Sequence, residues 1–186
     1  MTEDRQNDME LRLRKNRGHR LVADWSLSLS RACGVEISAT SFLSIERTED
    51  LRRAYFNKIR TISDKAKLFW GTQERDRLVA HLLDVCVDVR TTAVILFSSV
   101  DRFVGAVRVP ADTVLRNAIA VWDIVNEDLC VTTDDLQHGL CLEENFYYPA
   151  GEYVSGGLYE LTVWGLFAKE CGEEGSGLMD LSGCGQ

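Results

Sequence analysis

The chain has 186 residues, of which 45% are hydrophobic and 27% are charged, and its formal net charge at pH 7 is −8. These proportions are those of an ordinary globular protein, and they exclude a disordered or collagen-like chain. No run approaches the roughly 18 consecutive apolar residues of a membrane-spanning helix, so we expect no contact with a membrane. The N-terminal segment contains acidic side chains and lacks the apolar core of a secretory signal, which predicts a cytoplasmic protein.

The six cysteines are scattered along the sequence without a C-x-x-C pair. In a chain of this length, such spacing argues against a disulfide scaffold. Cys130, His138 and Cys141 lie close in sequence, but their spacing is not that of a standard zinc motif and no fourth ligand is obvious. We therefore predict neither a metal nor a cofactor, and we expect Cys86 and Cys130 to be buried as small hydrophobic side chains.

Composition divides the chain into three parts. Residues 1–17 are mostly charged and predict a flexible or frayed N-terminal arm. Residues 18–169 predict a single α+β domain, with a helical half at 18–90 and a sheet half at 91–169. Residues 170–186 are acidic and rich in glycine, which is typical of a flexible tail.

The helical half shows three apolar patterns with the period of an α-helix. Residues 19–33 predict the first helix, with Gly34 as its stop. A second helix is predicted to begin at a Thr48 cap and to end before Gly71. Its apolar stripe consists of Leu51, Tyr55, Ile59, Ile62, Ala66 and Phe69. A third helix starts at Thr72, and the short connection predicts a helical hairpin.

From residue 92 the pattern changes to that of β-strands. Residues 92–99 and 102–109 predict two buried strands, and Pro110 begins another helix. Three further strands are predicted at 129–133, 139–148 and 158–167. The turns between them are expected at Asp134-Asp135, Pro149-Ala150-Gly151 and Ser155-Gly156-Gly157. The short loops indicate a meander, so the predicted fold class is α+β, with N-terminal helices packed on a largely antiparallel sheet crossed by one helix.

The last predicted strand, at 158–167, has two different faces. The face that we expect in the core consists of Tyr159, Leu161, Val163 and Phe167. The other face carries Glu160 and Trp164. Either this face contacts a partner, or a helix covers it, in which case Trp164 belongs to the core and Glu160 needs a basic neighbour.

Charge is distributed unevenly along the chain. Residues 1–70 carry 14 basic and 10 acidic side chains, whereas residues 117–186 carry 13 acidic side chains and one basic side chain, Lys169. The acidic segment cannot neutralise itself, so its carboxylates must face water, bind a cation, pack beside the basic helices or contact a cationic partner. The overall negative charge does not favour nucleic-acid binding, and we interpret the basic residues of the helix at 51–69 as a solvated face.

Acidic residues alternate with aromatic residues in the predicted meander, although a strand there would place Phe146 in the core. Aromatic anchors with an acidic rim are typical of a surface that docks a basic protein. We expect the partner-binding residues to be Asp134, Asp135, Glu143, Glu144, Tyr147, Tyr148, Glu152, Tyr153, Glu160 and Trp164.

A small acidic α+β protein with aromatic strands and no catalytic motif resembles in type the immunity proteins that bacteria keep against their own secreted toxins. The leading hypothesis is a protein-binding inhibitor of immunity, anti-toxin or anti-defence type, which blocks a basic toxin or nuclease-like partner. One alternative is a small cytosolic enzyme with a carboxylate or Cys/His site in residues 130–145. Another is a subunit of a larger assembly. The sequence assigns no catalytic residue and no oligomeric state.

Overall fold

The computed structural model describes residues 3–63, 65–85, 91–125, 128–147, 151 and 153–165. Its helices are α1 (Glu3–Cys33), α2 (Ile45–Thr61), α3 (Arg75–Val85), α4 (Asp101–Val104), α5 (Ala111–Arg116) and α6 (Ala118–Val125), with short 3-10 helices η1 (Ala39–Ser41) and η2 (Thr72–Glu74). Its strands are β1 (Ala66–Gly71), β2 (Ala93–Leu96), β3 (Val107–Pro110), β4 (Leu129–Thr132), β5 (Gly139–Tyr147) and β6 (Tyr153–Trp164). The fold is α+β, as predicted, and the strands form one antiparallel sheet in the order β1-β6-β5-β4-β2-β3.

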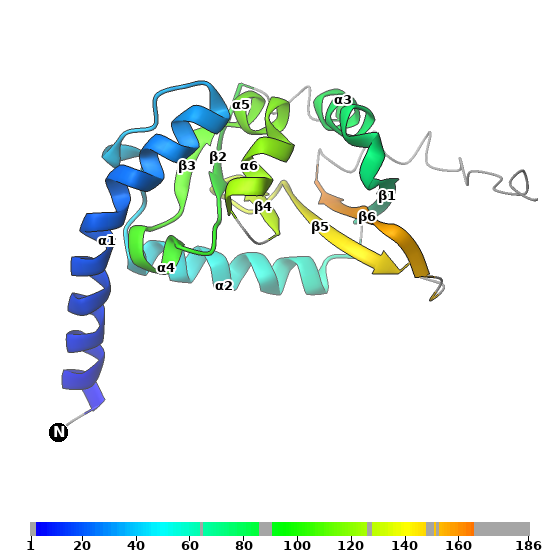
Figure 1. Ribbon diagram of the computed structural model, residues 1–186. Coiled ribbons are helices and arrows are strands. Elements are labelled where there is room, and N and C mark those ends of the chain that lie inside the picture. Colours follow the sequence, from blue (N-terminus) through cyan, green and yellow to red (C-terminus); the bar gives the residue numbers. More distant parts are fainter. Residues whose placement is uncertain are drawn as a thin grey trace, which may run out of the picture.

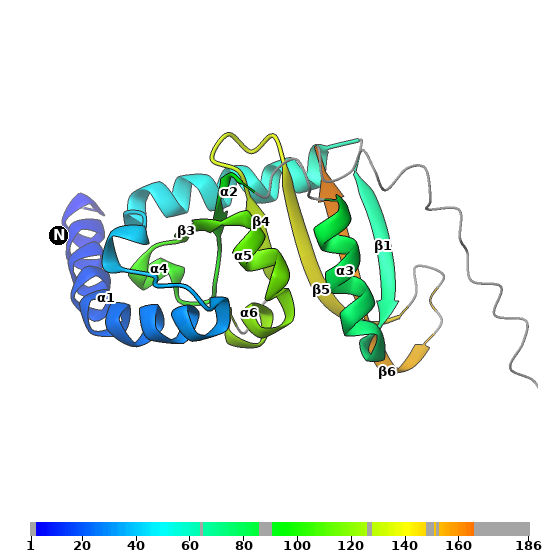
Figure 2. The same ribbon diagram turned by 90° about the horizontal axis from the view of Figure 1, so that it is seen from above.

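The sheet lies between two layers of helices (Figure 1). Helix α2 runs along one side, which we call the α2 face, and α3, α5 and α6 lie on the opposite side (Figures 1 and 2). Because successive residues of a strand point to opposite faces, neighbours such as Leu140 and Cys141 belong to two different cores. The α2 face contains a core of Leu51, Tyr55, Ile95, Phe97, Ala106, Cys130, Cys141 and Trp164.

The buried Tyr55 fastens α2 to the middle of the sheet. Its hydroxyl donates a hydrogen bond of 2.7 Å to the Leu140 carbonyl, and its ring lies 5.3 Å from the rings of Phe97 and Trp164. Burial raises the pKa of Tyr55 well above its usual value, so the hydroxyl keeps the proton that it donates. Trp164 fits here because Gly139, opposite it on β5, has no side chain. A Cβ atom on Gly139 would lie 2.1 Å from the indole.

The helix predicted at 51–69 is correct only as far as Thr61. After it, Ala66, Leu68 and Trp70 pack against the core opposite α2 and alternate with Lys67 and Phe69, so the period is two and the segment is the strand β1. The apolar residues at 62, 66 and 69 fit a helical stripe, but the pairing of β1 with β6 overrides that pattern. The helical hairpin is therefore absent from the described residues, and the predicted helical half supplies an outer strand of the sheet.

The cap of α2 also differs from the prediction. Ser44, not Thr48, is the cap, and its hydroxyl accepts a hydrogen bond of 3.1 Å from the Arg47 amide. Thr48 lies within the helix and is buried, where its hydroxyl accepts a 2.8 Å hydrogen bond from the Ala106 amide. Thr48 therefore joins α2 to the loop that precedes β3.

Residues 3–17, for which the sequence predicted a flexible or frayed arm, are helical and belong to α1. Lys15 forms an ion pair of 2.7 Å with Glu46, and Arg14 pairs with Glu49, so this part of α1 is tied to α2. Gly18 lets α1 approach α4 closely, because a Cβ atom there would lie 1.8 Å from the Phe103 carbonyl oxygen. The tail predicted at 170–186 lies outside the described residues.

The strand predicted at 102–109 is correct only from Val107, because residues 102–104 belong to the short helix α4. β2 pairs antiparallel with β3, with the short helix α4 between them, and the helix after Pro110 divides at Asn117 into α5 and α6. The antiparallel meander of β4, β5 and β6 is confirmed. Gly156 and Gly157 do not form a separate turn, because β6 already begins at Tyr153.

Replacing Tyr55 with phenylalanine tests the attachment of α2. The variant Tyr55→Phe keeps the packed ring and loses only the hydrogen bond to Leu140, so we expect the free energy of unfolding to fall by about 1 kcal/mol. Urea unfolding measures this as a lower midpoint at an unchanged slope. The matched control is Tyr153→Phe, in which the ring is 65% exposed and no change is expected. Equal stability of the wild type and Tyr55→Phe would contradict this account.

Candidate functional site

Four side chains with metal-ligating atoms form a block on the α2 face. Cys130 on β4 lies directly opposite Cys141 on β5. Asp128 comes immediately before β4, and continuing the register of Leu129 and Leu142 by one residue places it opposite Glu143. Residues two apart on a strand share a face, so two neighbouring cross-strand pairs lie side by side. We call Asp128, Cys130, Cys141 and Glu143 the four-residue block.

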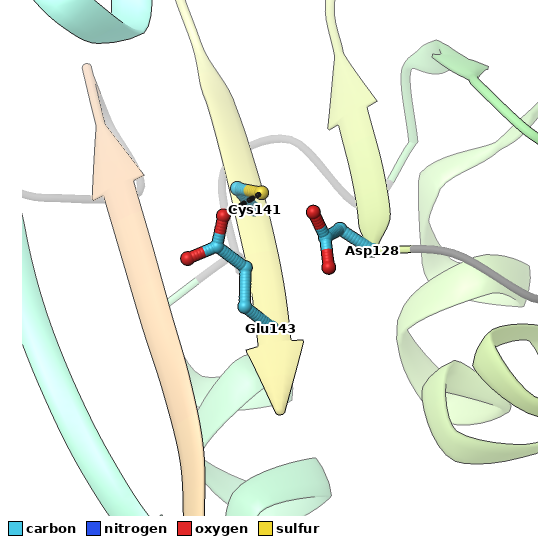
Figure 3. Close-up of side chains that lie close together, drawn as sticks. All are labelled: Asp128, Cys141 and Glu143. Atoms are coloured by element: carbon cyan, nitrogen blue, oxygen red, sulfur yellow. Dashed lines mark hydrogen bonds between the residues drawn. The ribbon is translucent and has the colours of Figure 1, made fainter. Parts of the chain in front are cut away.

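The ligand atoms of the block are close to one another. The sulfur atoms of Cys130 and Cys141 are 3.5 Å apart, and the Cys141 thiol donates to a Glu143 carboxylate oxygen at 3.7 Å. One ligand atom each of Asp128, Cys141 and Glu143 lies within 4.8 Å of the other two. Figure 3 shows both carboxyl groups near the Cys141 sulfur. The two cysteines are buried, Glu143 is half-buried and Asp128 is exposed.

Negative charge accumulates around this block. Glu143 lies opposite Glu160 on β6, so the carboxylates of Asp128, Glu143 and Glu160 form a row across three neighbouring strands. Burial and then the charges of Asp128 and Glu160 raise the pKa of Glu143. The contact with Cys130, together with burial, raises the pKa of Cys141, so its thiol stays protonated. The negative charge of these carboxylates would therefore stabilise a cation bound at the block.

Glu160 at the end of this row has a basic neighbour. Its side chain is nearly buried and forms an ion pair with Lys67 from β1, while the amide of Asn145 donates a 3.3 Å hydrogen bond to its other oxygen. Lys67 was not among the expected site residues, because the helix predicted at 51–69 placed it on a solvated helix face and not on β1. The alternation of apolar residues at 66, 68 and 70 is the signal that would have placed Lys67 on a strand.

Two of the expected docking residues, Trp164 and Glu160, are buried and so cannot form part of an exposed docking surface. Trp164 is fully buried and Glu160 is only 7% exposed, so neither side chain lies on an open surface. The cause is α2, whose Tyr55 packs on Trp164. The structure therefore matches the alternative in which a helix covers this face and Glu160 pairs with a basic residue.

Asp134 and Asp135 lie in the turn between β4 and β5, away from the other expected contact residues. Both carboxylate oxygens of Asp134 accept hydrogen bonds of 2.8 Å from Arg108. Asp135 accepts from the Thr133 hydroxyl at 2.6 Å and the Gln137 amide at 3.0 Å, which lowers its pKa. The length of β5, at roughly 3.4 Å per residue, separates this turn from Tyr147. Both carboxylates therefore already have partners within the fold.

The loop end of the β5–β6 hairpin, where β5 ends and β6 begins, carries exposed aromatic side chains. Tyr147 is 55% exposed and Tyr153 is 65% exposed, with their rings 5.7 Å apart. Phe146, which we expected in the core, is 46% exposed, and Glu144 beside it is also exposed. We call Glu144, Phe146, Tyr147 and Tyr153 the hairpin tip. The expected contact residues Tyr148 and Glu152 lie outside the described residues.

A small cavity adjoins the four-residue block. It has a volume of about 130 Å³ and is lined by Arg52, Phe56, Phe97, Ser98, Asp128 and Cys130. Pockets for organic ligands usually measure roughly 300–1,000 Å³, so this cavity suits an ion or a few water molecules. In the described part of the chain no histidine joins the block. His81 instead packs against Trp70, and His138 lies in the β4–β5 turn.

Residues 31–153 match the family model described as YxiF protein. This match covers about two thirds of the chain, so the chain belongs to that family. The matched region includes the four-residue block and the hairpin tip. No curated protein and no solved structure matches the chain. Within the described residues, none of the helices combines the length and apolar character needed to cross a membrane.

Removing the Lys67 ammonium tests the pairing of the buried carboxylate. We expect Lys67→Met to lower the free energy of unfolding by about 1–3 kcal/mol, because Glu160 is left nearly buried without its cation. The control is the same substitution in a Glu160→Gln background, where the loss should be smaller. Thermal or urea unfolding of the four proteins measures the difference. Equal losses in both backgrounds would show that the ion pair does not stabilise the fold.

Proposed function

We propose that this member of the YxiF family is a protein-binding inhibitor of immunity type, which acts in the cytoplasm and blocks a basic toxin or nuclease-like protein. In this proposal the hairpin tip is the centre of the docking surface. The observation that carries the proposal is the exposure of Phe146, Tyr147 and Tyr153 together at the end of one hairpin. They lie in the segment that has 13 acidic side chains and one basic side chain.

Exposed aromatic clusters favour binding for an energetic reason. A tyrosine ring buries a large apolar area and has few rotatable bonds, so it contributes affinity with little loss of conformational entropy. Interfaces are accordingly enriched in such anchors, and their energy is concentrated in a few central residues. Glu144 beside the rings supplies negative charge at the surface, where it would speed association with a cationic partner.

The structure narrows the set of proposed contact residues. Asp134 is paired with Arg108 and Asp135 completes its own turn, so neither carboxylate requires a partner protein. Glu160 and Trp164 are buried. Among the expected contact residues, those that are both exposed and close together are Glu144, Tyr147 and Tyr153. Phe146, which was not expected to contact a partner, lies beside them.

The alternative of an enzyme has one observation in its favour, the contact between Cys141 and Glu143. A nucleophilic cysteine needs a lowered pKa so that the thiolate is present, whereas the pKa of Cys141 is raised by its contact with Cys130 and by burial. The adjacent cavity of about 130 Å³ is also small for an organic substrate. These two properties argue against a cysteine nucleophile in the four-residue block.

Affinity capture with paired baits tests the docking surface. The wild type and two variants are incubated with lysate of the cells that produce the protein, and bound proteins are eluted with increasing salt and identified by mass spectrometry. The first variant, Glu144→Lys with Tyr153→Ala, alters the hairpin tip. The second, Asp24→Lys, makes the same charge reversal at an exposed position on α1. We expect one basic protein to bind the wild type and Asp24→Lys, and to be lost or weakened at least about tenfold with the tip variant.

The captured protein is then purified and its own activity is measured with and without the inhibitor. Full inhibition by the wild type and Asp24→Lys, with reduced inhibition by the tip variant, is the expected result. Equal binding by both variants, or binding without any effect on the partner's activity, would overturn the proposal. Far-ultraviolet circular dichroism of each variant separates loss of docking from loss of folding.

A further inference from the structure

The four-residue block contains three residues whose ligand atoms lie within 4.8 Å of one another, Asp128, Cys141 and Glu143, and a fourth, Cys130, whose sulfur lies 3.5 Å from that of Cys141. We propose that Cys130, Cys141, Asp128 and Glu143 bind one Zn²⁺ ion. This proposal is independent of the docking function, because it concerns the α2 face of β4 and β5 and not the aromatic residues of the hairpin tip. It replaces the expectation from the sequence that the chain holds no metal.

The separation of the two sulfur atoms supports this site. Two thiolates that share a tetrahedral zinc ion, each at about 2.3 Å, lie roughly 3.8 Å apart. The Cys130 and Cys141 sulfurs are 3.5 Å apart before any ion is considered, so they need to move by only a few tenths of an ångström. Both thiols are at least 95% buried, at 4% and 2% exposure, and they point to the same side of the sheet. A buried pair of soft ligands is therefore already preorganised.

The carboxylates supply the other two ligands from the same surface. Ligand atoms of Asp128, Cys141 and Glu143 lie within 4.8 Å of one another. Ligands around a tetrahedral zinc ion lie roughly 3.3–3.8 Å apart, so the carboxylates reach these positions by moving inward by at most about 1.5 Å. Two thiolates and two carboxylates fill the four positions of a tetrahedral zinc site. Thiolate ligands favour zinc over Mg²⁺ and Ca²⁺, which prefer sites built from oxygen alone.

Electrostatics also favours a cation here. Asp128, Glu143 and Glu160 form a row of like charges, and Lys67 pairs with the far end of that row. A divalent ion between Asp128 and Glu143 would relieve the remaining repulsion. The cavity of about 130 Å³ is lined by Asp128 and Cys130, and also by Arg52, so the block borders this cavity. Thiols bind zinc as thiolates, and binding therefore releases their protons to water.

Metal binding by the reduced, full-length protein tests the site directly. Co²⁺ serves as a spectroscopic probe for Zn²⁺ because it has a thiolate charge-transfer band and the visible bands of a tetrahedral ion. We expect one Co²⁺ per chain with both features, displacement of Co²⁺ by Zn²⁺, and no displacement by Mg²⁺. We also expect Zn²⁺ to raise the melting temperature, because binding to the folded state stabilises it.

Variants assign the ligands. Cys141→Ser should abolish the charge-transfer band, and Cys130→Ser should reduce it. Asp128→Asn should weaken binding by at least about tenfold, the lower end of what even an outer-shell partner contributes. Asp128 is exposed, so Asp128→Asn is expected to fold normally. It therefore still tests the site if a cysteine variant fails to fold.

Two controls separate this site from other thiols. Cys33→Ser removes a buried cysteine that packs in the core opposite α2, and Cys171→Ser with Cys184→Ser removes two from the C-terminal segment. All of these controls should retain binding. The proposal would be overturned by the absence of metal uptake, by binding that survives in Cys141→Ser, or by binding that is lost in the tail variant. A Cys130–Cys141 disulfide in the isolated protein, found by mass spectrometry together with no metal uptake after reduction, would also overturn it.

Discussion

The position of α2 against the sheet is the constraint on which the other features depend, and the hydrogen bond from Tyr55 to the Leu140 carbonyl fixes that position. An antiparallel meander would ordinarily leave one face to solvent. Here Tyr55 and Trp164 close that face over β4, β5 and β6, so both faces of the central strands are buried. Polar side chains on the α2 face are consequently either paired, as Glu160 is with Lys67, or gathered at the margin of the helix, as Asp128 and Glu143 are.

The two candidate sites differ because this cover ends partway along β5. Near the middle of the strand, Cys141 lies beneath α2 and Glu143 is half-buried, which is an environment suited to a small ion. Farther along, Phe146 lies on the face opposite α2, and both Phe146 and Tyr147 are exposed to solvent, an environment suited to contact with a large partner surface. β5 thus passes from a buried environment at Cys141 to a solvent-exposed one at Phe146. The proposed metal site and the proposed docking surface can therefore be altered separately.

Much of the fold could be predicted because the alternation within β4, β5 and β6 and the turns between them are local signals. The strand β1 could not, because its apolar residues also match a helical period and only pairing with β6 decides between the two. The four-residue block illustrates a missed signal: Asp128-Leu-Cys130 and Cys141-Leu-Glu143 are mirror images about the predicted turn. In an antiparallel hairpin, that symmetry places acid opposite acid and thiol opposite thiol. The burial of Trp164 had no comparable local signal, because it depends on α2 and on Gly139.

The charged residues within the meander also have a consequence for how the chain finds its correct pairing. A shift of β5 by one residue relative to its neighbours would exchange its two faces. In one direction of slip, Glu143 would take the position of Leu142 in the apolar core opposite α2, and Glu144 would take the position of Glu143 on the α2 face. Burying an unpaired carboxylate among aliphatic side chains costs far more than the hydrophobic contacts could return. The half-buried Glu143 therefore makes this misaligned register less stable than the native one.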